Sequence, residues 1–259
     1  MSGQINDTLP VTPRDRPVRS AFKVDMKKPR EIVAKTRAAA AGDPYAMKLL
    51  ADGLRACAEV SQVTNDQIEN REAQLTLKAT ANNADGQTQE SGFVRYAAQH
   101  AAEQEAARNT CAGIVSDESA KWSDWLKTAA AAGDPGARVS YAENYPALAR
   151  KGDVPSDELE QYRSDAFDYL ENELAQGNCS AEVLNALRYV SPNPATTYVY
   201  DSILFGKPRP PSADPAAAAQ EAARQSIIAK RQAAVPPDQL DDANAARDYV
   251  LQNYCQNRM

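Results

Sequence analysis

The phrase Ala-Ala-Ala-Ala-Gly-Asp-Pro occurs twice in the chain, at residues 38–44 and 129–135. A run of alanines is a strong helix former, and a glycine directly after it is typical of the left-handed residue that ends a helix. The aspartate can accept hydrogen bonds from the first free amides of a following helix, and proline is favoured at that helix's first position. The phrase therefore predicts a tight corner between two helices at both places.

The residues four, eight, nine and twelve positions after each of these glycines also repeat. They are Ala46, Leu50, Ala51 and Leu54 after Gly42, and Ala137, Tyr141, Ala142 and Tyr145 after Gly133. A third, weaker copy after Gly177 consists of Ala181, Asn185, Ala186 and Tyr189. Small and large residues at these offsets share one helix face, so they predict helices that pack closely.

Helical hairpins with this pattern resemble Sel1-like repeats, a branch of the tetratricopeptide-type solenoids. The 44-residue step from Gly133 to Gly177 suits that family, whereas the 91-residue step from Gly42 to Gly133 requires an atypical hairpin between them. The resemblance covers about half of the chain and brings no catalytic residue. It implies an all-α stack of helical hairpins whose curved inner face binds proteins or peptides.

The rest of the pattern predicts about twelve helices and no strand. Residues 1–27, with three prolines and no apolar period, are expected to form an extended N-terminal arm. Residues 28–206 are expected to form the Sel1-like body, and 207–259 a C-terminal helical hairpin packing on it after a proline-rich connector. One helix is expected from Pro29 to Ala41, and another from Pro135 to Tyr145–Pro146. The abundance of alanine and the 7% of aromatic residues suit closely packed helices better than a β-sandwich.

The charge balance limits the classes of partner. The chain has 35 acidic and 29 basic residues, a formal net charge of −6. An acidic chain without a basic stripe argues against nucleic acid as a partner, because phosphate is neutralised by Lys and Arg. No apolar run approaches the length of a transmembrane helix. The first ten residues lack a signal-peptide pattern, so either the protein begins this way or a leader or membrane anchor upstream of residue 1 has been lost.

The four cysteines are Cys57, Cys111, Cys179 and Cys255. They are far apart and the chain has a single histidine, so a zinc site is disfavoured. Two disulfides in an exported protein are preferred, in the pairing Cys57–Cys111 and Cys179–Cys255, because each pair joins helices in the same half of the chain. The predicted location is therefore periplasmic or secreted. The alternative is four buried thiols in a cytoplasmic protein.

Catalytic patterns are missing from the sequence. It has no glycine-rich phosphate loop, no G-x-S-x-G and no H-E-x-x-H. The acidic pairs at 117–118, 157–158 and 241–242 begin expected helices, where they favour the helix dipole. His100 lies on the apolar stripe of a helix expected over 91–112, so we interpret it as a core histidine rather than a general base. We expect no enzyme, no cofactor and no metal ion; a glycan-cleaving enzyme with two groove carboxylates is the less favoured alternative.

The function predicted from the sequence is protein–protein interaction without catalysis. The chain is expected to be an exported bacterial binding protein or an inhibitor or immunity-type protein, or alternatively a structural or assembly factor of an envelope or secretion system. Leu50, Tyr141 and Trp122 are expected to be occupied in the core. Tyr198 and Tyr200 are the expected partner-binding residues, because positions two apart on a helix should not both face a core. In the alternative, one of them packs and the other covers the proline connector.

Overall fold

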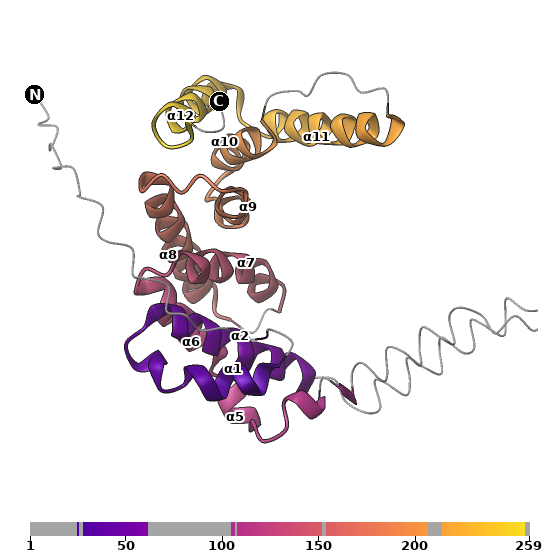
Figure 1. Cartoon of the computed structure of the whole chain (residues 1–259). Coiled ribbons are helices and arrows are strands. Elements are labelled where there is room, and N and C mark those ends of the chain that lie inside the picture. The colour runs from indigo at the N-terminus through magenta and orange to yellow at the C-terminus, as the bar shows by residue number, and fades with distance from the viewer. Residues whose placement is uncertain are drawn as a thin grey trace, which may run out of the picture. The chain divides into compact units, whose positions relative to one another are not determined.

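The computed structural model describes residues 25, 28–61, 105–106, 108–151, 154–206 and 214–256 (Figure 1). All regular structure in these residues is helical, and they contain no strand. The expected N-terminal arm apart from Asp25, a further helix that the sequence predicts over 64–78, and His100 lie outside the described residues. The α-helices are α1 (Pro29–Thr36), α2 (Pro44–Ser61), α5 (Ser116–Ser119), α6 (Trp122–Ala131), α7 (Pro135–Lys151), α8 (Ser156–Ala175), α9 (Ala181–Val190), α10 (Pro194–Phe205), α11 (Pro215–Ala233) and α12 (Leu240–Asn253). Two 3₁₀ turns are η1 (Ala39–Ala41) and η2 (Pro237–Gln239).

The helices group into two compact units, and the boundary falls inside α7, between residues 137 and 138. We call residues 22–137 the N-terminal unit; it contains α1, α2, α5 and α6. We call residues 138–259 the C-terminal unit; it contains the rest of α7 and α8 to α12. The two units are described separately below.

The core of the N-terminal unit lies where α2 packs against α1 and α6. Leu50 and Leu54 are buried there, and Trp122 and Trp125 pack against them while remaining partly exposed. Gly53 allows α1 to approach α2, because a Cβ at this position would lie 3.0 Å from the Val33 side chain. The small offset residues Ala46 and Ala51 are also buried, so the unit is held by close contact between small and aliphatic residues, as the offsets after Gly42 predict.

The two predicted corners share their caps but differ at their glycines. Asp43 accepts a hydrogen bond from the Tyr45 amide at 2.9 Å, and Asp134 accepts one from the Ala137 amide at 2.7 Å, as expected. Gly133 has a φ of 93° and is the expected left-handed residue. The expectation for Gly42 is wrong, because its φ is −151°.

The cause is the way the two helices end. The α6 helix runs to Ala131, and the amides of Gly133 and Asp134 then bond back to the carbonyls of Ala130 and Ala129, which requires a left-handed residue. The α1 helix stops earlier, at Thr36, and the 3₁₀ turn η1 carries the chain into the first corner. The expected helix Pro29–Ala41 is therefore two elements, and its last turn needs no positive φ.

The third repeat copy has a different register from the first two. Ala46 and Ala137 are buried, whereas the matching Ala181 is exposed, and Tyr189 is 42% exposed where the matching Leu54 is buried. Of the third copy, Ala186 is buried like its counterparts Ala51 and Ala142. The α2 and α7 helices begin two residues after their glycines, but α9 begins four residues after Gly177, with Ser180 as its cap. The longer connection rotates α9, so that its buried face consists of Val183, Leu184, Ala186, Leu187 and Val190.

The C-terminal unit is a chain of packed helices. The α8 helix packs on α9, α9 packs on α10, and α10 contacts both α11 and α12 (Figure 1). Leu170, Leu184 and Ile203 are among its buried residues. In contrast, none of the described residues of α11 is buried. Thus α11 and α12 each pack on α10.

The expected end of a helix at Tyr145–Pro146 is wrong, since α7 continues through Pro146 to Lys151. Proline removes one backbone hydrogen bond, which leaves the carbonyl of Ala142 without its usual amide. One residue earlier, the Tyr162 hydroxyl donates a 2.5 Å hydrogen bond to the Tyr141 carbonyl, and the Tyr162 ring stacks on Tyr141 at 3.8 Å. Packing from α8 therefore supports α7 at the position that proline weakens.

Both units are closed by a disulfide. Cys57 is joined to Cys111 and Cys179 to Cys255, with Cα–Cα distances of 5.5 and 5.2 Å. This is the pairing expected from the sequence. The second bond links the connection after α8 to a residue just beyond the end of α12. Among the described helices, none combines the length and the apolarity needed to cross a membrane.

Candidate functional site

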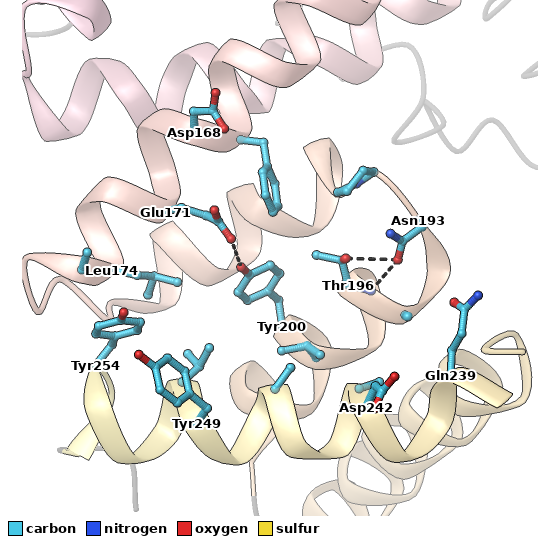
Figure 2. A pocket seen from close by; sticks show the side chains of 18 of the residues that line it. Asp168, Glu171, Leu174, Asn193, Thr196, Tyr200, Gln239, Asp242, Tyr249 and Tyr254 are labelled. Carbon is cyan, nitrogen blue, oxygen red and sulfur yellow. Dashed lines mark hydrogen bonds between the residues drawn. The ribbon is translucent and has the colours of Figure 1, made fainter. Parts of the chain in front are cut away.

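A groove of about 1040 Å³ opens in the C-terminal unit between α8 and α12, with α10 between them (Figure 2). Its lining comes from one face of each helix. On α12 the lining includes Asp242, Ala246, Tyr249 and Val250, whose spacing of three and four residues keeps them on one side. The groove is therefore built from residues that lie far apart in the sequence.

Local capping fixes the α10 side of the groove. Asn193 is the N-cap of α10, and its side-chain oxygen accepts hydrogen bonds from the amide and the hydroxyl of Thr196, at 2.9 and 3.0 Å. Pro194 follows at the first helical position, where proline is favoured. This cap sets where α10 begins, and so places Val199 and Tyr200 two turns later along the groove.

The floor of the groove is apolar and its rim is aromatic. Leu174, Val199 and Ala243 are buried in its lining. Tyr249 stands on the rim with 56% of its surface exposed, and its ring contacts that of Tyr254 edge to face at 5.8 Å. An exposed aromatic ring above an apolar floor provides surface that a bound molecule can cover.

The charges that line the groove are negative. Asp168, Glu171 and Asp242 contribute carboxylates, and the described lining contains no Lys or Arg. Glu171 accepts a 3.1 Å hydrogen bond from the Tyr200 hydroxyl. Burial raises the pKa of Tyr200, and the Glu171 carboxylate raises it further, so this phenol stays neutral and donates.

On the rim, Tyr249 affects Tyr254 more than Glu171 does. A hydrogen bond to Tyr249 raises the pKa of Tyr254, with further contributions from burial and from the charge of Glu171. Figure 2 shows Glu171, Tyr200, Tyr249 and Tyr254 together toward one end of the groove, and Asp242 and Gln239 toward the other. The first end therefore combines aromatic faces with a negative charge.

The structure contradicts the predicted exposure of Tyr198 or Tyr200. Both side chains are only 4% exposed. Because α10 is covered by α9, α11 and α12, positions two apart on it can both be buried. The Tyr198 hydroxyl donates to Asn244 of α12 at 3.0 Å, whereas Tyr200 lines the groove. Neither is the exposed anchor that the sequence predicts.

The exposed aromatic of the groove is Tyr249, which the sequence interpretation missed. The sequence feature that could have indicated it is the position of Tyr249 and Tyr254 close to Cys255. A disulfide at Cys255 brings the end of α12 toward α8. The acidic pair 241–242 does lie in the first turn of α12, as expected from the helix dipole. Asp242 also lines the groove.

The arrangement is suited to binding more than to acid–base chemistry. Asp168, Glu171 and Asp242 are exposed, whereas the general acid of a glycan-cleaving enzyme usually sits in an apolar pocket. The described residues contain no cluster of three His, Cys, Asp or Glu that could hold a metal ion. The groove can take up apolar groups on its floor and positive charge at its carboxylates. No protein-family model matches the chain, and neither curated proteins nor solved structures provide a match.

Proposed function

We propose that the chain is a non-enzymatic protein-binding module that holds a polypeptide partner in the groove between α8 and α12. The observation that carries this proposal is Tyr249, a large aromatic residue left 56% exposed above an apolar floor. Tyrosine is enriched among the residues that dominate binding energy at protein interfaces. Ala246 and Val250, which line the groove from the same face of α12, supply accessible apolar surface beside this anchor.

The covalent structure supports binding by a preorganised groove. Cys179 follows α8 and Cys255 follows α12, so one disulfide joins the two walls of the groove near their C-terminal ends. A groove whose walls are already fixed loses less conformational entropy when a partner binds. No cofactor is part of this function.

Two disulfides also support a location outside the reducing cytoplasm, in the periplasm or secreted. The proposed role is therefore an exported binding protein of the inhibitor or immunity type. The Sel1-like stacking of hairpins belongs to the same proposal. It is supported by the two Gly-Asp-Pro corners, whose aspartates cap α2 and α7.

Site-specific photo-crosslinking tests the proposal. A benzoylphenylalanine placed at Tyr249 in the oxidised protein is mixed with the envelope and secreted fractions of the source organism. The matched control carries the same group at Tyr189, which is 42% exposed on α9 and does not line the groove. We expect a defined protein adduct from position 249 only. Equal adducts from both positions, or none from position 249, would contradict the proposal.

A further inference from the structure

We infer that the partner segment held between α8 and α12 is a positively charged amphipathic helix. This inference rests on the proposed function and adds the chemistry of the occupant. Three features of the groove lead to it: a negative charge that no described Lys or Arg pairs, an aromatic end that suits a cation, and an apolar floor that extends along α12.

The first feature is the state of the carboxylates. Asp168, Glu171 and Asp242 form no ion pair with a described Lys or Arg, although they line one groove. Other carboxylates on α8 do have such partners, since Glu160 contacts Arg163 and Glu173 contacts Arg138 at 2.8 Å. The groove carboxylates of α8 thus keep their negative charge, whereas Glu160 and Glu173 are paired with arginines. A cationic partner would be attracted to it and oriented by it.

The second feature is the end of the groove near Glu171. Its carboxylate lies beside Tyr200, and the rings of Tyr249 and Tyr254 meet edge to face on the facing wall (Figure 2). Aromatic faces attract ammonium and guanidinium groups, and a carboxylate provides the matching charge. A Lys or Arg side chain of the partner fits this end. Asp242 offers a second position for positive charge toward the other end.

The third feature is the length and character of the floor. The groove follows α12, whose 14 residues correspond to about 21 Å, or about four helical turns. Along it Ala246 and Val250 offer accessible apolar surface, and the buried Leu174 and Val199 complete the apolar lining. An amphipathic helix of similar length presents apolar residues at every third or fourth position, with charges on either side of the stripe. Cations flanking such a stripe would face Glu171 and Asp242.

The test uses four fluorescein-labelled 18-residue peptides and the intact, oxidised protein. One peptide is a Lys/Leu helix with Leu at positions i, i+3, i+4 and i+7, and the second replaces every Lys with Glu. The third has the Lys/Leu composition in scrambled order, and the fourth carries two prolines in its centre. Fluorescence anisotropy at two salt concentrations gives the Kd values. We expect the Lys/Leu helix to bind at least tenfold more tightly than the other three, and more weakly in high salt.

Matched variants locate that binding. Glu171→Gln combined with Asp242→Asn is expected to weaken binding of the Lys/Leu helix at least tenfold. The control combines Glu158→Gln with Asp241→Asn, which removes the same charge from α8 and α12 outside the groove lining and should change Kd less than twofold. Because all four side chains are exposed, these variants should fold normally, which circular dichroism verifies.

Each other result overturns the inference in a distinct way. Equal binding of the Glu/Leu peptide rejects the positive charge, and equal binding of the scrambled or proline peptide rejects the helix. Equal effects of the two variant pairs show nonspecific attraction to an acidic protein. A dimer in sedimentation that Tyr249→Ala dissociates assigns the groove to a second copy. If the Lys/Leu helix fails while position 249 still crosslinks a partner, the proposed function survives and this inference does not.

Discussion

The two units end their helices with similar caps and each contains one disulfide, but their interiors are built differently. Both tryptophans lie within residues 22–137, whereas nine of the 11 tyrosines lie within 138–259. In the N-terminal unit small residues bring helices together, as at Gly53. In the C-terminal unit the buried acids Glu173 and Asp201 contact arginines. The ion pairs of the N-terminal unit, such as Lys48–Asp52, are partly exposed.

This difference explains why the groove lies in the C-terminal unit. Contacts between small residues draw helices together until little space remains. Directional bonds hold helices at a set distance: Arg138 of α7 reaches Glu173 of α8, and Tyr198 of α10 reaches Asn244 of α12. Helices positioned by such bonds can border an open space without collapsing into it. The distribution of Trp and Tyr also gives each unit its own spectroscopic signal.

The largest expected effect comes from the disulfides. Replacing Cys179 and Cys255 with alanine should lower the free energy of unfolding of the C-terminal unit by about 4 kcal/mol, because the bond closes a long loop. Near-ultraviolet circular dichroism of tyrosine should report this loss in a urea titration, while tryptophan fluorescence should change little. Replacing Cys57 and Cys111 should give the reverse pattern. If either pair shifts both signals equally, the two units do not unfold separately.

The next effect concerns Asp201, which is fully buried on α10. Arg231 Nε donates a 2.9 Å hydrogen bond to it, and Arg188 Nε contacts it at 2.6 Å as an ion pair. Asp201→Ala leaves both arginines without this partner, so it should cost about 3 kcal/mol. The matched change in the other unit, Asp52→Ala, should cost less than about 1 kcal/mol because its pair is partly exposed. Urea unfolding of both variants measures the difference, and equal costs would remove the contrast between the units.

A pH effect should be confined to the C-terminal unit. Burial raises the pKa of Tyr141 and of Tyr200 above the ordinary value, with nearby carboxylates adding to the shift. The unfolded chain therefore loses these protons first as pH rises. The contribution of these tyrosines to the free energy of unfolding is fully present below about pH 10. Above that pH, each contribution should fall by about 1.4 kcal/mol per pH unit until the tyrosine of the folded protein ionises.

Urea midpoints at pH 8 and pH 11 measure this loss. Tyrosine circular dichroism should show a lower midpoint at pH 11, and Tyr200→Phe should reduce the shift because phenylalanine carries no titrating group. Tryptophan fluorescence serves as the internal control for the N-terminal unit. An equal alkaline shift in both signals would show that the effect is not due to these tyrosines.

The smallest effects concern the glycines at the corners. Gly133→Ala and Gly177→Ala should each cost about 1 kcal/mol, because both positions have a positive φ, of 93° and 81°. Gly42→Ala should change stability by less than about 0.5 kcal/mol, since its φ is negative and an added Cβ meets no described atom within 4 Å. Thermal melting of the three variants tests this. A cost at Gly42 equal to that at Gly133 would restore the identical corners that the sequence predicts.

Features governed by neighbouring residues could be predicted from the sequence. Asp43, Asp134 and Asp214 each cap the helix that follows, because a cap depends on only three or four consecutive residues. The disulfide pairing followed from the order of the helices. The continuation of α7 through Pro146 could not be predicted, because support comes from Tyr162 on another helix.

The groove required information that a linear pattern does not contain. Helical spacing places Asp242 and Tyr249 on one face of α12, but it does not say which helix that face meets. The burial of both Tyr198 and Tyr200 has the same cause, since it depends on how many helices surround α10. Sequence therefore predicted the helical fold and the aspartate caps, whereas tertiary packing determined that α7 continues to Lys151 and which side chains line the site.

The bond between Cys179 and Cys255 also determines how the C-terminal unit responds to tension. A pulling force that enters through α8 and leaves after Cys255 passes across the two sulfur atoms, because they bridge 76 residues of chain. The helices α9 to α12 lie in the loop that the disulfide closes, so the force does not stretch them. About 250 Å of contour length stays hidden from the force until the bond is reduced. The groove can therefore keep its floor and its α12 wall while the rest of the chain is extended.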